Sequence, residues 1–494
     1  ATQKMVCLCD NVDISSIKLT DKQIKVYEFL NEYKCASLKE ICYYLGITAS
    51  VVDNLIKKGI AKYYKEQIYR DPYKNLSVKQ STCAINLTTE QREASDSLYK
   101  KYIENKPCVS LLYGITGSGK TSVFMDLIDK VIDDGDGIIV MVPEISLTAQ
   151  LMQSFRSRYG KKVAIFHSAL SQGERLDEYK RVKNGEVKIA VGTRSAIFAP
   201  FKKVKLIIMD EEHEYTYKSE STPRYHARDI AKFRCNYSDG LLILSSATPS
   251  IESYYMAEHN VYTLERLTKR YGNAKLPKVD IVDMNKELTS GNTSIFSRKL
   301  ILSLKENLEN KRQSILLLNR RGYNTFAKCR ACDEVLTCPN CSVSMIYHSD
   351  NKKLMCHYCG YNMDITDKCP NCNEREIKYI GFGTQRLEDE LNKLLSSARI
   401  LRMDRDTTMR KFSYENKLKM FENLEYDIMI GTQMVSKGLN FKNVTLVGVL
   451  SADQSLYNND FRSYERTFSL ITQVVGRSGR GQIEGSAIIQ TFTP

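Results

Sequence analysis

Residues 114–121 have the sequence GITGSGKT, which is typical of a loop that wraps the phosphates of a nucleoside triphosphate. Its glycines let backbone N–H groups turn toward phosphate oxygens. These glycines are Gly114, Gly117 and Gly119. Lys120 adds a positive charge at the β- and γ-phosphates, and the hydroxyl of Thr121 is a ligand for Mg²⁺. Because the loop follows an apolar run at 109–113 and precedes a helical pattern, we predict a site for ATP with Mg²⁺.

Residues 206–213, LIIMDEEH, form an apolar run that ends in acidic side chains. A strand of a parallel sheet delivers such acids to the sheet edge at which ligands bind. We expect Asp210 to hold Mg²⁺ through water and Glu211 to polarise the attacking water, because phosphoryl transfer needs mainly positioning and charge neutralisation. The alternative is a solvated acidic turn, which the phosphate-binding loop upstream makes the weaker interpretation.

Eight of the fifteen cysteines form four Cys-x-x-Cys pairs within residues 329–372. The pairs are Cys329/Cys332, Cys338/Cys341, Cys356/Cys359 and Cys369/Cys372. Each pair can clamp one edge of a tetrahedral Zn²⁺ ion, and four thiolates per ion leave no position for a reactive water. We therefore predict two structural Zn²⁺ ions.

Two groupings of these pairs are open, since neighbouring pairs can share an ion or the sites can nest. The five-residue spacer after Cys332 is short for two pairs that face one ion, whereas the fourteen residues after Cys341 can form a hairpin. These spacers favour nesting. One ion would bind Cys338, Cys341, Cys356 and Cys359, and the other would bind Cys329, Cys332, Cys369 and Cys372.

The composition indicates a folded chain with a basic surface. The 494 residues predict about three or four domains, and the formal net charge is +14. Eight thiolates on two Zn²⁺ would lower this charge to about +10, which still favours a polyanionic partner over a merely Lys-rich surface. No apolar run approaches the roughly 18 residues that span a bilayer, and no secretory signal opens the chain. We expect a cytoplasmic protein without a membrane partner.

The hydrophobic pattern predicts three regions of different structure. Residues 20–58 show the periodicity of three helices, and short strands are predicted at 60–64 and 67–69, an order typical of a winged helix. A protein–protein spacer is the alternative interpretation of this region. From residue 109, short Val/Ile/Leu runs alternate with helical stretches, which predicts two lobes built on parallel sheets with both faces covered. The cysteine pairs interrupt the second lobe.

Aromatic side chains follow the acidic residues closely. They are Tyr215, Tyr217 and Tyr225, and Arg228 comes three residues later. Bases stack on aromatic faces with about 1–3 kcal/mol each, whatever their sequence. A loop of this composition is a candidate contact for single-stranded nucleic acid. In the alternative interpretation, the tyrosines pack the loop onto its own lobe.

Further motifs complete the set. They are VPEISLT at 142–148, GTRSA at 192–196, SSATPS at 245–250, GTQMVSKG at 431–438 and QVVGRSGR at 473–480. With the phosphate-binding loop and the DEEH residues, these motifs resemble those of superfamily 2 helicases. Together with the four cysteine pairs they resemble, from about residue 19 to the end, the PriA family of bacterial replication-restart helicases.

The resemblance implies roles for further residues. Gln91 would recognise the adenine base, and Arg477 and Arg480 would be arginine fingers that reach the γ-phosphate, with Gln473 beside them. The aromatic loop would couple single-stranded DNA to hydrolysis. The family pattern has His-Asp-Phe where residues 439–441 read Leu-Asn-Phe, which puts the function of position 440 in doubt.

The resemblance also implies an ATP-dependent DNA helicase of 3′→5′ polarity that acts at stalled or forked DNA. Its expected partners are single-stranded and forked DNA, primosome proteins and single-strand-binding proteins. Two alternatives stay open: a DNA-stimulated ATPase that remodels protein–DNA complexes without unwinding, and a scaffold in which the zinc region recruits partners and the ATPase is vestigial. The intact catalytic residues argue against the scaffold. They are Lys120, Asp210, Glu211, Arg477 and Arg480.

The predicted fold is α/β, with two RecA-like lobes, an N-terminal winged helix and a two-zinc insertion in the second lobe. The predicted domains are a remnant of an N-terminal DNA-binding domain at 1–18, the winged helix at 19–75, the first lobe at 76–265, the second lobe at 266–327 and 377–494, and the zinc-binding insertion at 328–376. The chain lacks an initiator Met and stops just after a predicted strand, so we expect a fragment of a longer protein.

Overall fold

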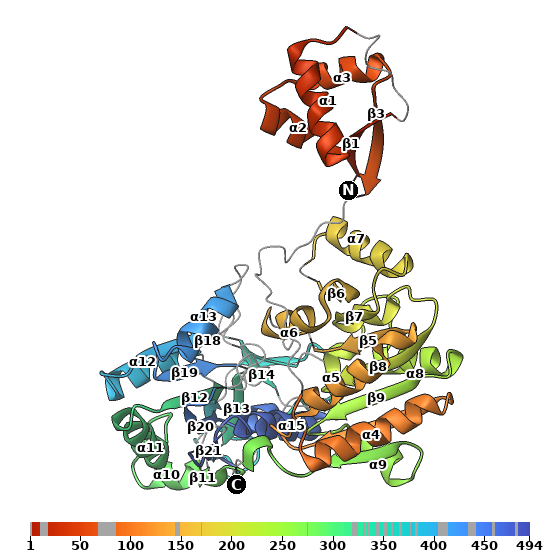
Figure 1. The fold of residues 1–494 in the computed structure, drawn as a ribbon. Coiled ribbons are helices and arrows are strands. Elements are labelled where there is room, and N and C mark those ends of the chain that lie inside the picture. Colours follow the sequence, from red (N-terminus) through yellow and green to blue (C-terminus); the bar gives the residue numbers. More distant parts are fainter. Residues whose placement is uncertain are drawn as a thin grey trace. The chain divides into compact units, whose positions relative to one another are not determined.

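Figure 1 shows the computed structural model of the chain. The structure describes residues 2–9, 18–67, 85–143, 149–168, 170–273, 275–318, 325–329, 331–332, 335–341, 345–348, 353–356, 359–364, 368–375, 377–380, 384–403, 413–432, 441–456, 460–479 and 483–494. The chain forms two compact units, one of residues 1–78 with 168–186 and the other of residues 79–167 with 187–494. Among the described residues, no helix is both long and apolar enough to cross a bilayer.

The first unit contains the three helices that the periodicity predicts, packed with a small antiparallel sheet of order β2-β1-β3. Its elements are β1 (Thr2–Leu8), α1 (Asp21–Tyr33), β2 (Cys35–Ser37), α2 (Leu38–Leu45), α3 (Ala49–Lys57), β3 (Ala61–Gln67) and, later in the chain, α7 (Gln172–Lys183). Helix α2 begins with a capping box, in which Ser37 and Glu40 exchange hydrogen bonds between side chain and backbone.

Two features of this unit differ from the expectation. The two short strands predicted at 60–64 and 67–69 are instead one strand through Gln67, and residues 68 and 69 lie outside the described residues. The sequence predicts no strand within residues 1–18, yet β1 pairs with β3 along its whole length, from Thr2 opposite Gln67 to Leu8 opposite Ala61. Such non-local pairing leaves little trace in a local pattern. The winged-helix assignment and the domain boundaries stay predictions.

The first lobe is a parallel sheet of seven strands with the order β10-β4-β9-β8-β5-β7-β6. The strands are β4 (Cys108–Gly114), β5 (Gly137–Met141), β6 (Val163–Phe166), β7 (Ile189–Gly192), β8 (Val204–Asp210), β9 (Leu241–Ser246) and β10 (Thr263–Leu267). The helices are α4 (Thr89–Ile103), α5 (Lys120–Val131), α6 (Ala149–Tyr159), α8 (Ala227–Tyr237) and α9 (Ile251–Glu258). Since β9 separates β4 from β8, the phosphate-binding loop and the acidic residues leave the same edge of the sheet one strand apart.

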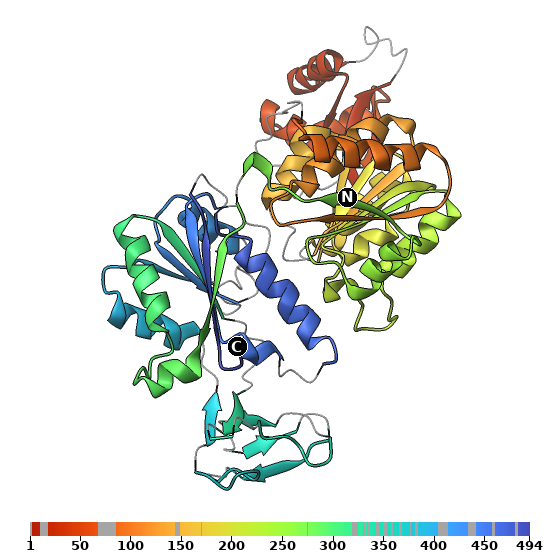
Figure 2. The same cartoon turned by 90° about the horizontal axis from the view of Figure 1, so that it is seen from below.

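The second lobe is a parallel sheet of order β11-β21-β20-β12-β19-β18. Its strands are β11 (Lys278–Asp283), β12 (Gln313–Leu318), β18 (Ile400–Met403), β19 (Ile428–Gly431), β20 (Val444–Leu450) and β21 (Ser486–Thr491). Its helices are α10 (Met284–Thr289), α11 (Arg298–Glu309), α12 (Thr384–Leu394), α13 (Ser413–Glu422), α14 (Asp453–Leu456) and α15 (Ser463–Val475). In Figure 2 the green α11 and the blue α15 lie on opposite sides of this sheet.

The side-chain alternation along β12 explains why helices cover both faces. Ile315 and Leu317 belong to one core with α13 and α15, whereas Leu316 and Leu318 belong to the other with α11 and α12. Every residue of the strand is therefore buried, and the strand appears in the sequence as a continuous apolar run. The predicted fold class, two RecA-like lobes with a cysteine-rich insertion, is confirmed.

The cysteine-rich module, which contains the eight paired cysteines from Cys329 to Cys372, is built around short antiparallel strands of order β16-β15-β14-β13-β17. They are β13 (Thr325–Cys329), β14 (Ile346–His348), β15 (Lys353–Met355), β16 (Asn362–Asp364) and β17 (Ile377–Ile380). Strands β14 and β15 are the two arms of the hairpin predicted between Cys341 and Cys356. The module therefore returns the third cysteine pair toward the second.

Candidate functional site

The phosphate-binding loop joins the end of β4 to the start of α5. Gly117 and Gly119 have φ angles of +81° and +80°, which side chains other than glycine rarely adopt. Lys120, the first residue of α5, donates from Nζ to the carbonyl of Gly114 at 2.8 Å. The loop thus presents the N-terminus of α5, whose free N–H groups and dipole attract anions. The predicted glycines, Lys120 and Thr121 lie together in this turn.

Gln91 holds the phosphate-binding loop from the side. Its Nε2 donates to the carbonyl of Ser118 at 2.7 Å, and its Oε1 accepts from the backbone of Thr88 at 2.9 Å. A Cβ atom added to Gly119 would lie 2.3 Å from Nε2 of Gln91, so this contact itself requires the glycine. The side chain is buried. Gln91 therefore links the cap of α4 to the loop, a role that its sequence context did not reveal, and adenine recognition stays a prediction.

The acidic residues lie at the end of β8, where the strand leaves the sheet. Asp210 accepts from the hydroxyl of Ser245 on β9 at 3.1 Å. Burial, and then the negative charge of Glu211, raise the pKa of the Asp210 carboxyl to about 6. A divalent cation beside this carboxyl favours its charged form. Glu211 has a φ of +47°, an uncommon conformation for a residue other than glycine, and such backbone strain is concentrated at functional sites.

Gln473 of α15 brings the second lobe to these acids. Its Nε2 donates to Oε2 of Glu211 at 3.1 Å and lies 3.0 Å from Nε2 of His213. The amide nitrogen of Gln473 is a donor, so Nε2 of His213 must accept from it. The proton of the neutral imidazole is then on Nδ1 of His213, which donates to the hydroxyl of Ser246 at 2.7 Å. A chain of hydrogen bonds therefore runs from α15 through His213 to the end of β9. The sequence motifs alone do not reveal this role of His213 and Ser246.

The loop after α15 lies directly against the phosphate-binding loop. A Cβ atom added to Gly476 would lie 2.1 Å from Oγ1 of Thr116, so only glycine permits this approach. Arg477 follows immediately, and its backbone N–H donates to the carbonyl of Val474. Arg480, the second predicted finger, lies outside the described residues. The structure thus brings the backbone that carries Arg477 beside the phosphate-binding loop.

The four residues predicted to contact nucleic acid divide into two kinds. Tyr217 is buried and its hydroxyl donates to the carbonyl of Asp210 at 2.6 Å. Arg228 donates to the buried carboxylate of Glu212 at 3.1 Å and also to the hydroxyls of Ser250 and Ser253. For Tyr217 and Arg228, these contacts support the alternative interpretation, in which the side chains pack the loop onto its own lobe.

Tyr215 and Tyr225 are half-buried, like Arg228, and their rings lie against other side chains. The guanidinium of Arg466 lies 5.5 Å from the ring of Tyr215. The ring of Tyr225 meets that of Phe198 edge to face, with centroids 5.0 Å apart. Contact of these two side chains with nucleic acid stays a prediction.

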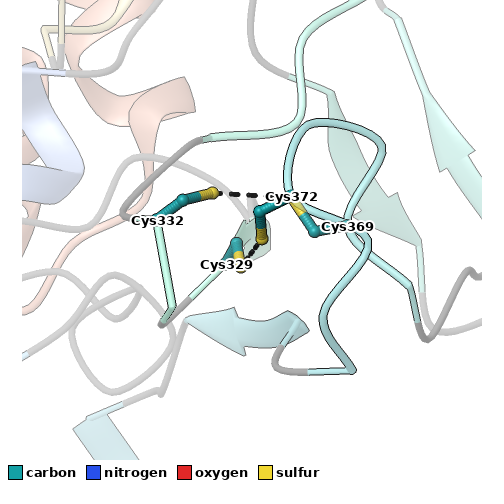
Figure 3. A group of neighbouring side chains, drawn as sticks. All are labelled: Cys329, Cys332, Cys369 and Cys372. Atoms are coloured by element: carbon teal, nitrogen blue, oxygen red, sulfur yellow. Dashed lines mark hydrogen bonds between the residues drawn. The ribbon is translucent and has the colours of Figure 1, made fainter.

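The eight cysteines form two clusters in the nested grouping that their spacing predicts. One cluster is Cys329, Cys332, Cys369 and Cys372, and the other is Cys338, Cys341, Cys356 and Cys359. Within each cluster the four sulfur atoms lie within 4.8 Å of one another. Figure 3 shows the first cluster, in which Sγ of Cys329 is 3.6 Å from that of Cys372. Zn–S bonds of about 2.3 Å place tetrahedral sulfurs about 3.8 Å apart, so both clusters fit zinc.

Each cluster also has a polar neighbour that the sequence analysis missed. Nδ2 of Asn371 lies 3.8 Å from Sγ of Cys332, and Nδ2 of Asn340 lies 3.9 Å from Sγ of Cys359. N–H donors directed at thiolates orient the ligands of a metal and tune their charge. The sequence contains a sign of this role, because both asparagines lie in the repeated sequence Cys-Pro-Asn-Cys.

Comparison with known proteins agrees with this geometry. Residues 88–257 match the DEAD/DEAH box helicase family, and residues 372–482 match the helicase conserved C-terminal domain. Residues 338–363 match the PriA DNA helicase Cys-rich region. The replication restart protein PriA of Rickettsia conorii is 36% identical over 98% of this chain and 76% of its own length. The chain belongs to the PriA family.

Other PriA proteins are more similar but longer. The replication restart protein PriA of Bacillus subtilis is 47% identical over 92% of this chain, and that of Synechocystis is 41% identical over 99%. The chain spans 56% and 59% of the lengths of these two relatives. For this PriA-family chain, the two tetracysteine clusters are zinc sites, and the DEAD domain binds ATP with Mg²⁺. The predicted cofactors are therefore confirmed.

Proposed function

We propose that this chain is the motor of an ATP-dependent DNA helicase that acts at stalled or forked DNA to restart replication. The observation that carries the proposal is the contact of 3.1 Å between Gln473 on α15 and Glu211 after β8. It joins the second lobe to the acidic residues of the first, so that hydrolysis and the relative position of the lobes depend on each other. Membership of the PriA family supports DNA as the polymer on which such a motor moves.

The roles of the residues follow from their positions. Lys120 and the α5 N-terminus would neutralise the phosphates, and Thr121 and Asp210 would hold the cation that screens the β- and γ-oxygens. Glu211 would orient and polarise the attacking water, while Gln473 holds its carboxylate from the other lobe. Arg477 would stabilise the charge that develops on the transferred phosphoryl group, a contribution of about 10³–10⁵ in rate for such fingers.

The finer parts of the proposal rest on the family alone. They are 3′→5′ polarity, primosome proteins and single-strand-binding proteins as partners, assembly of the primosome and a cytoplasmic location. Single-stranded DNA is expected to contact Tyr215 and Tyr225, because their rings are only half-buried.

Strand displacement on a forked duplex, measured together with ATP hydrolysis, tests the proposed function. We expect displacement that requires ATP, and hydrolysis that single-stranded DNA stimulates. Stimulated hydrolysis without displacement, but with removal of a bound protein from DNA, would favour the remodelling alternative. Hydrolysis that is absent with and without DNA would favour the scaffold.

Replacing Tyr215 and Tyr225 together by alanine is expected to lower the stimulation by single-stranded DNA about tenfold or more, because each lost stacking contact weakens binding by about 1–3 kcal/mol. Basal hydrolysis should change little, since the rings of Tyr215 and Tyr225 lie against Arg466 and Phe198, outside the phosphate-binding loop. Steady-state ATPase assays with and without an oligothymidylate measure both rates.

The matched control is Tyr237→Ala, which removes a tyrosine that is 80% exposed at the end of α8. This variant should retain both rates. Equal losses of basal and stimulated hydrolysis in the Tyr215/Tyr225 variant would instead support the packing interpretation for these two side chains.

A further inference from the structure

Arg270 lies in the segment that connects β10 of the first lobe to β11 of the second. Only 5% of its surface is exposed. Its guanidinium donates to the backbone on both sides of Arg477: Nη2 to the carbonyl of Gly476 at 3.2 Å, and Nη1 to those of Ser478 and Gly479 at 3.2 and 3.3 Å. Arg270 thus encloses the loop that carries the predicted finger.

The same side chain reaches the phosphate-binding loop. Its Nη2 lies 3.4 Å from Oγ1 of Thr116, and the next residue, Tyr271, donates its backbone N–H to the carbonyl of Gly117 at 2.9 Å. Thr116 is also the residue that a Cβ atom at Gly476 would meet. The guanidinium of Arg270 therefore joins three segments: the connection between the lobes, in which it lies, the phosphate-binding loop, and the loop that carries Arg477.

Physical chemistry explains why an arginine suits this place. Gly476, Ser478 and Gly479 lie just beyond α15, which ends at Val475, and their backbone carbonyls are acceptors that need donors when buried. A planar guanidinium has donors in a fixed fork, so it can bind several such carbonyls at once, whereas an ammonium has no fixed direction. The oxygens that accept from Arg270 are four carbonyls, including that of Lys275 at 3.2 Å, and one hydroxyl.

Burial of this charge also has a cost, because desolvation lowers the pKa of Arg270 and neutral oxygens compensate a buried cation less well than a carboxylate does. A neutral, apolar side chain of similar size would fill the space without this cost. The specific pattern of its donors, rather than the filling of space, is what the arginine supplies.

We propose that Arg270 is a positioning residue that sets the Arg477 loop against the phosphate-binding loop, and so makes ATP hydrolysis depend on the connection between the lobes. The inference rests on the proposed ATPase function. Its guanidinium donates to backbone carbonyls and to the hydroxyl of Thr116, so we infer that it acts through the position of Arg477. Separation of the lobes breaks its contacts with residues 476–479 and withdraws the finger.

Arg270→Lys tests the inference, because lysine keeps the charge and loses the fork. We expect kcat of DNA-stimulated hydrolysis to fall about 10–100-fold, as for other small misplacements of a catalytic group, while KM for ATP stays nearly constant. The control is Arg266→Lys, four residues earlier, whose guanidinium forms an exposed ion pair with Glu258. It should keep the kcat of the unaltered chain.

A double-mutant cycle with Arg477→Ala separates positioning from general support of the fold. If Arg270 acts through Arg477, then Arg270→Lys lowers kcat no further once Arg477 is alanine. Rates are normalised to the stoichiometry of fluorescent-nucleotide binding, so that a loss of folded protein does not appear as a loss of kcat. Multiplicative losses in the cycle, or a lower melting temperature with unchanged kcat, overturn the inference.

Gly476→Ala provides a second route to the same loop. Its methyl group would meet Oγ1 of Thr116 and push the loop away from the opposite side. We expect the same loss of kcat and the same absence of a further effect in the Arg477→Ala background. If the unaltered chain hydrolyses ATP and both Arg270→Lys and Gly476→Ala keep its kcat, the inference about Arg270 is refuted and the proposed function is not. If the unaltered chain does not hydrolyse ATP, the proposed function itself is refuted.

Discussion

Lys120→Ala and Glu211→Gln are each expected to lower DNA-stimulated ATP hydrolysis by about 10²–10⁴-fold while the lobes stay folded. Lys120 is the fixed positive charge at the phosphate-binding loop, where its Nζ donates to the carbonyl of Gly114. Glutamine at 211 keeps the size of the side chain and an oxygen that can accept from Gln473, but it cannot polarise water as a carboxylate does.

The two variants should differ in nucleotide affinity. Loss of Lys120 removes an attraction that exists before and during the reaction, so the dissociation constant for ATP should rise together with the fall in rate. Glu211→Gln should bind ATP as tightly as the unaltered chain or more tightly, because it removes a negative charge near the phosphates. Titration with a fluorescent ATP analogue and steady-state hydrolysis measure the two effects.

Matched controls lie nearby in the same lobe. Lys130→Ala removes a lysine from the same helix, where it pairs with Asp96 and Asp126 at the surface. Glu258→Gln removes an acid whose partner, Arg266, is exposed. Surface ion pairs contribute little, about 0–1 kcal/mol, so both controls should hydrolyse ATP normally. Near-normal turnover in Lys120→Ala or in Glu211→Gln would contradict the role assigned to that residue.

The features that the sequence predicts well are those encoded over a few consecutive residues. Strand β12 is a continuous apolar run, because both of its faces are covered. The phosphate-binding loop is recognisable because its glycines must adopt positive φ angles at fixed spacing from Lys120. The nested cysteine clusters follow from spacers that allow a hairpin in one place and not in another. In each case the physical constraint is local, so the pattern of residues carries it.

The features that the sequence does not reveal depend on partners far along the chain. Strand β10 carries polar residues at its centre because it forms an edge of the sheet, paired with β4 alone. Tyr217 and Arg228 lie in the same short segment of the sequence as Tyr215 and Tyr225. In the structure, however, Tyr217 donates to the carbonyl of Asp210 and Arg228 donates to the carboxylate of Glu212. Composition cannot separate an aromatic side chain that packs from one that faces a ligand.

Arg270 is the clearest example of this limit. Its partners at residues 476–479 lie more than 200 positions further along the chain, and the segment around it belongs to no motif. No local pattern distinguishes it from Arg266, which is exposed four residues earlier. The distinction arises only when both lobes are folded around the connection.

Metal analysis of paired cysteine variants is expected to separate the nested grouping from sharing by neighbouring pairs. The unaltered chain should contain two Zn²⁺ ions. Cys338→Ser with Cys356→Ser removes two ligands of one cluster and should leave one ion, whereas Cys329→Ser with Cys338→Ser removes one ligand of each cluster and should lose both. Sharing by neighbouring pairs predicts the opposite result for the two double variants. Cys35→Ser, which changes an exposed cysteine outside both clusters, should keep both ions.

Removal of zinc should unfold the cysteine-rich module before it disturbs the lobes. In the described part of the module the buried side chains that pack together are few, Leu336, Met345 and Leu354 with Cys338 and Cys356. Metal binding is therefore expected to supply much of its folding free energy. Each lobe, in contrast, has its own extensive core, as the two clusters of the second lobe show. A strong chelator should therefore expose residues 328–376 to protease while nucleotide binding persists. Simultaneous loss of nucleotide binding and of the module would mean that the lobes depend on zinc for their own stability.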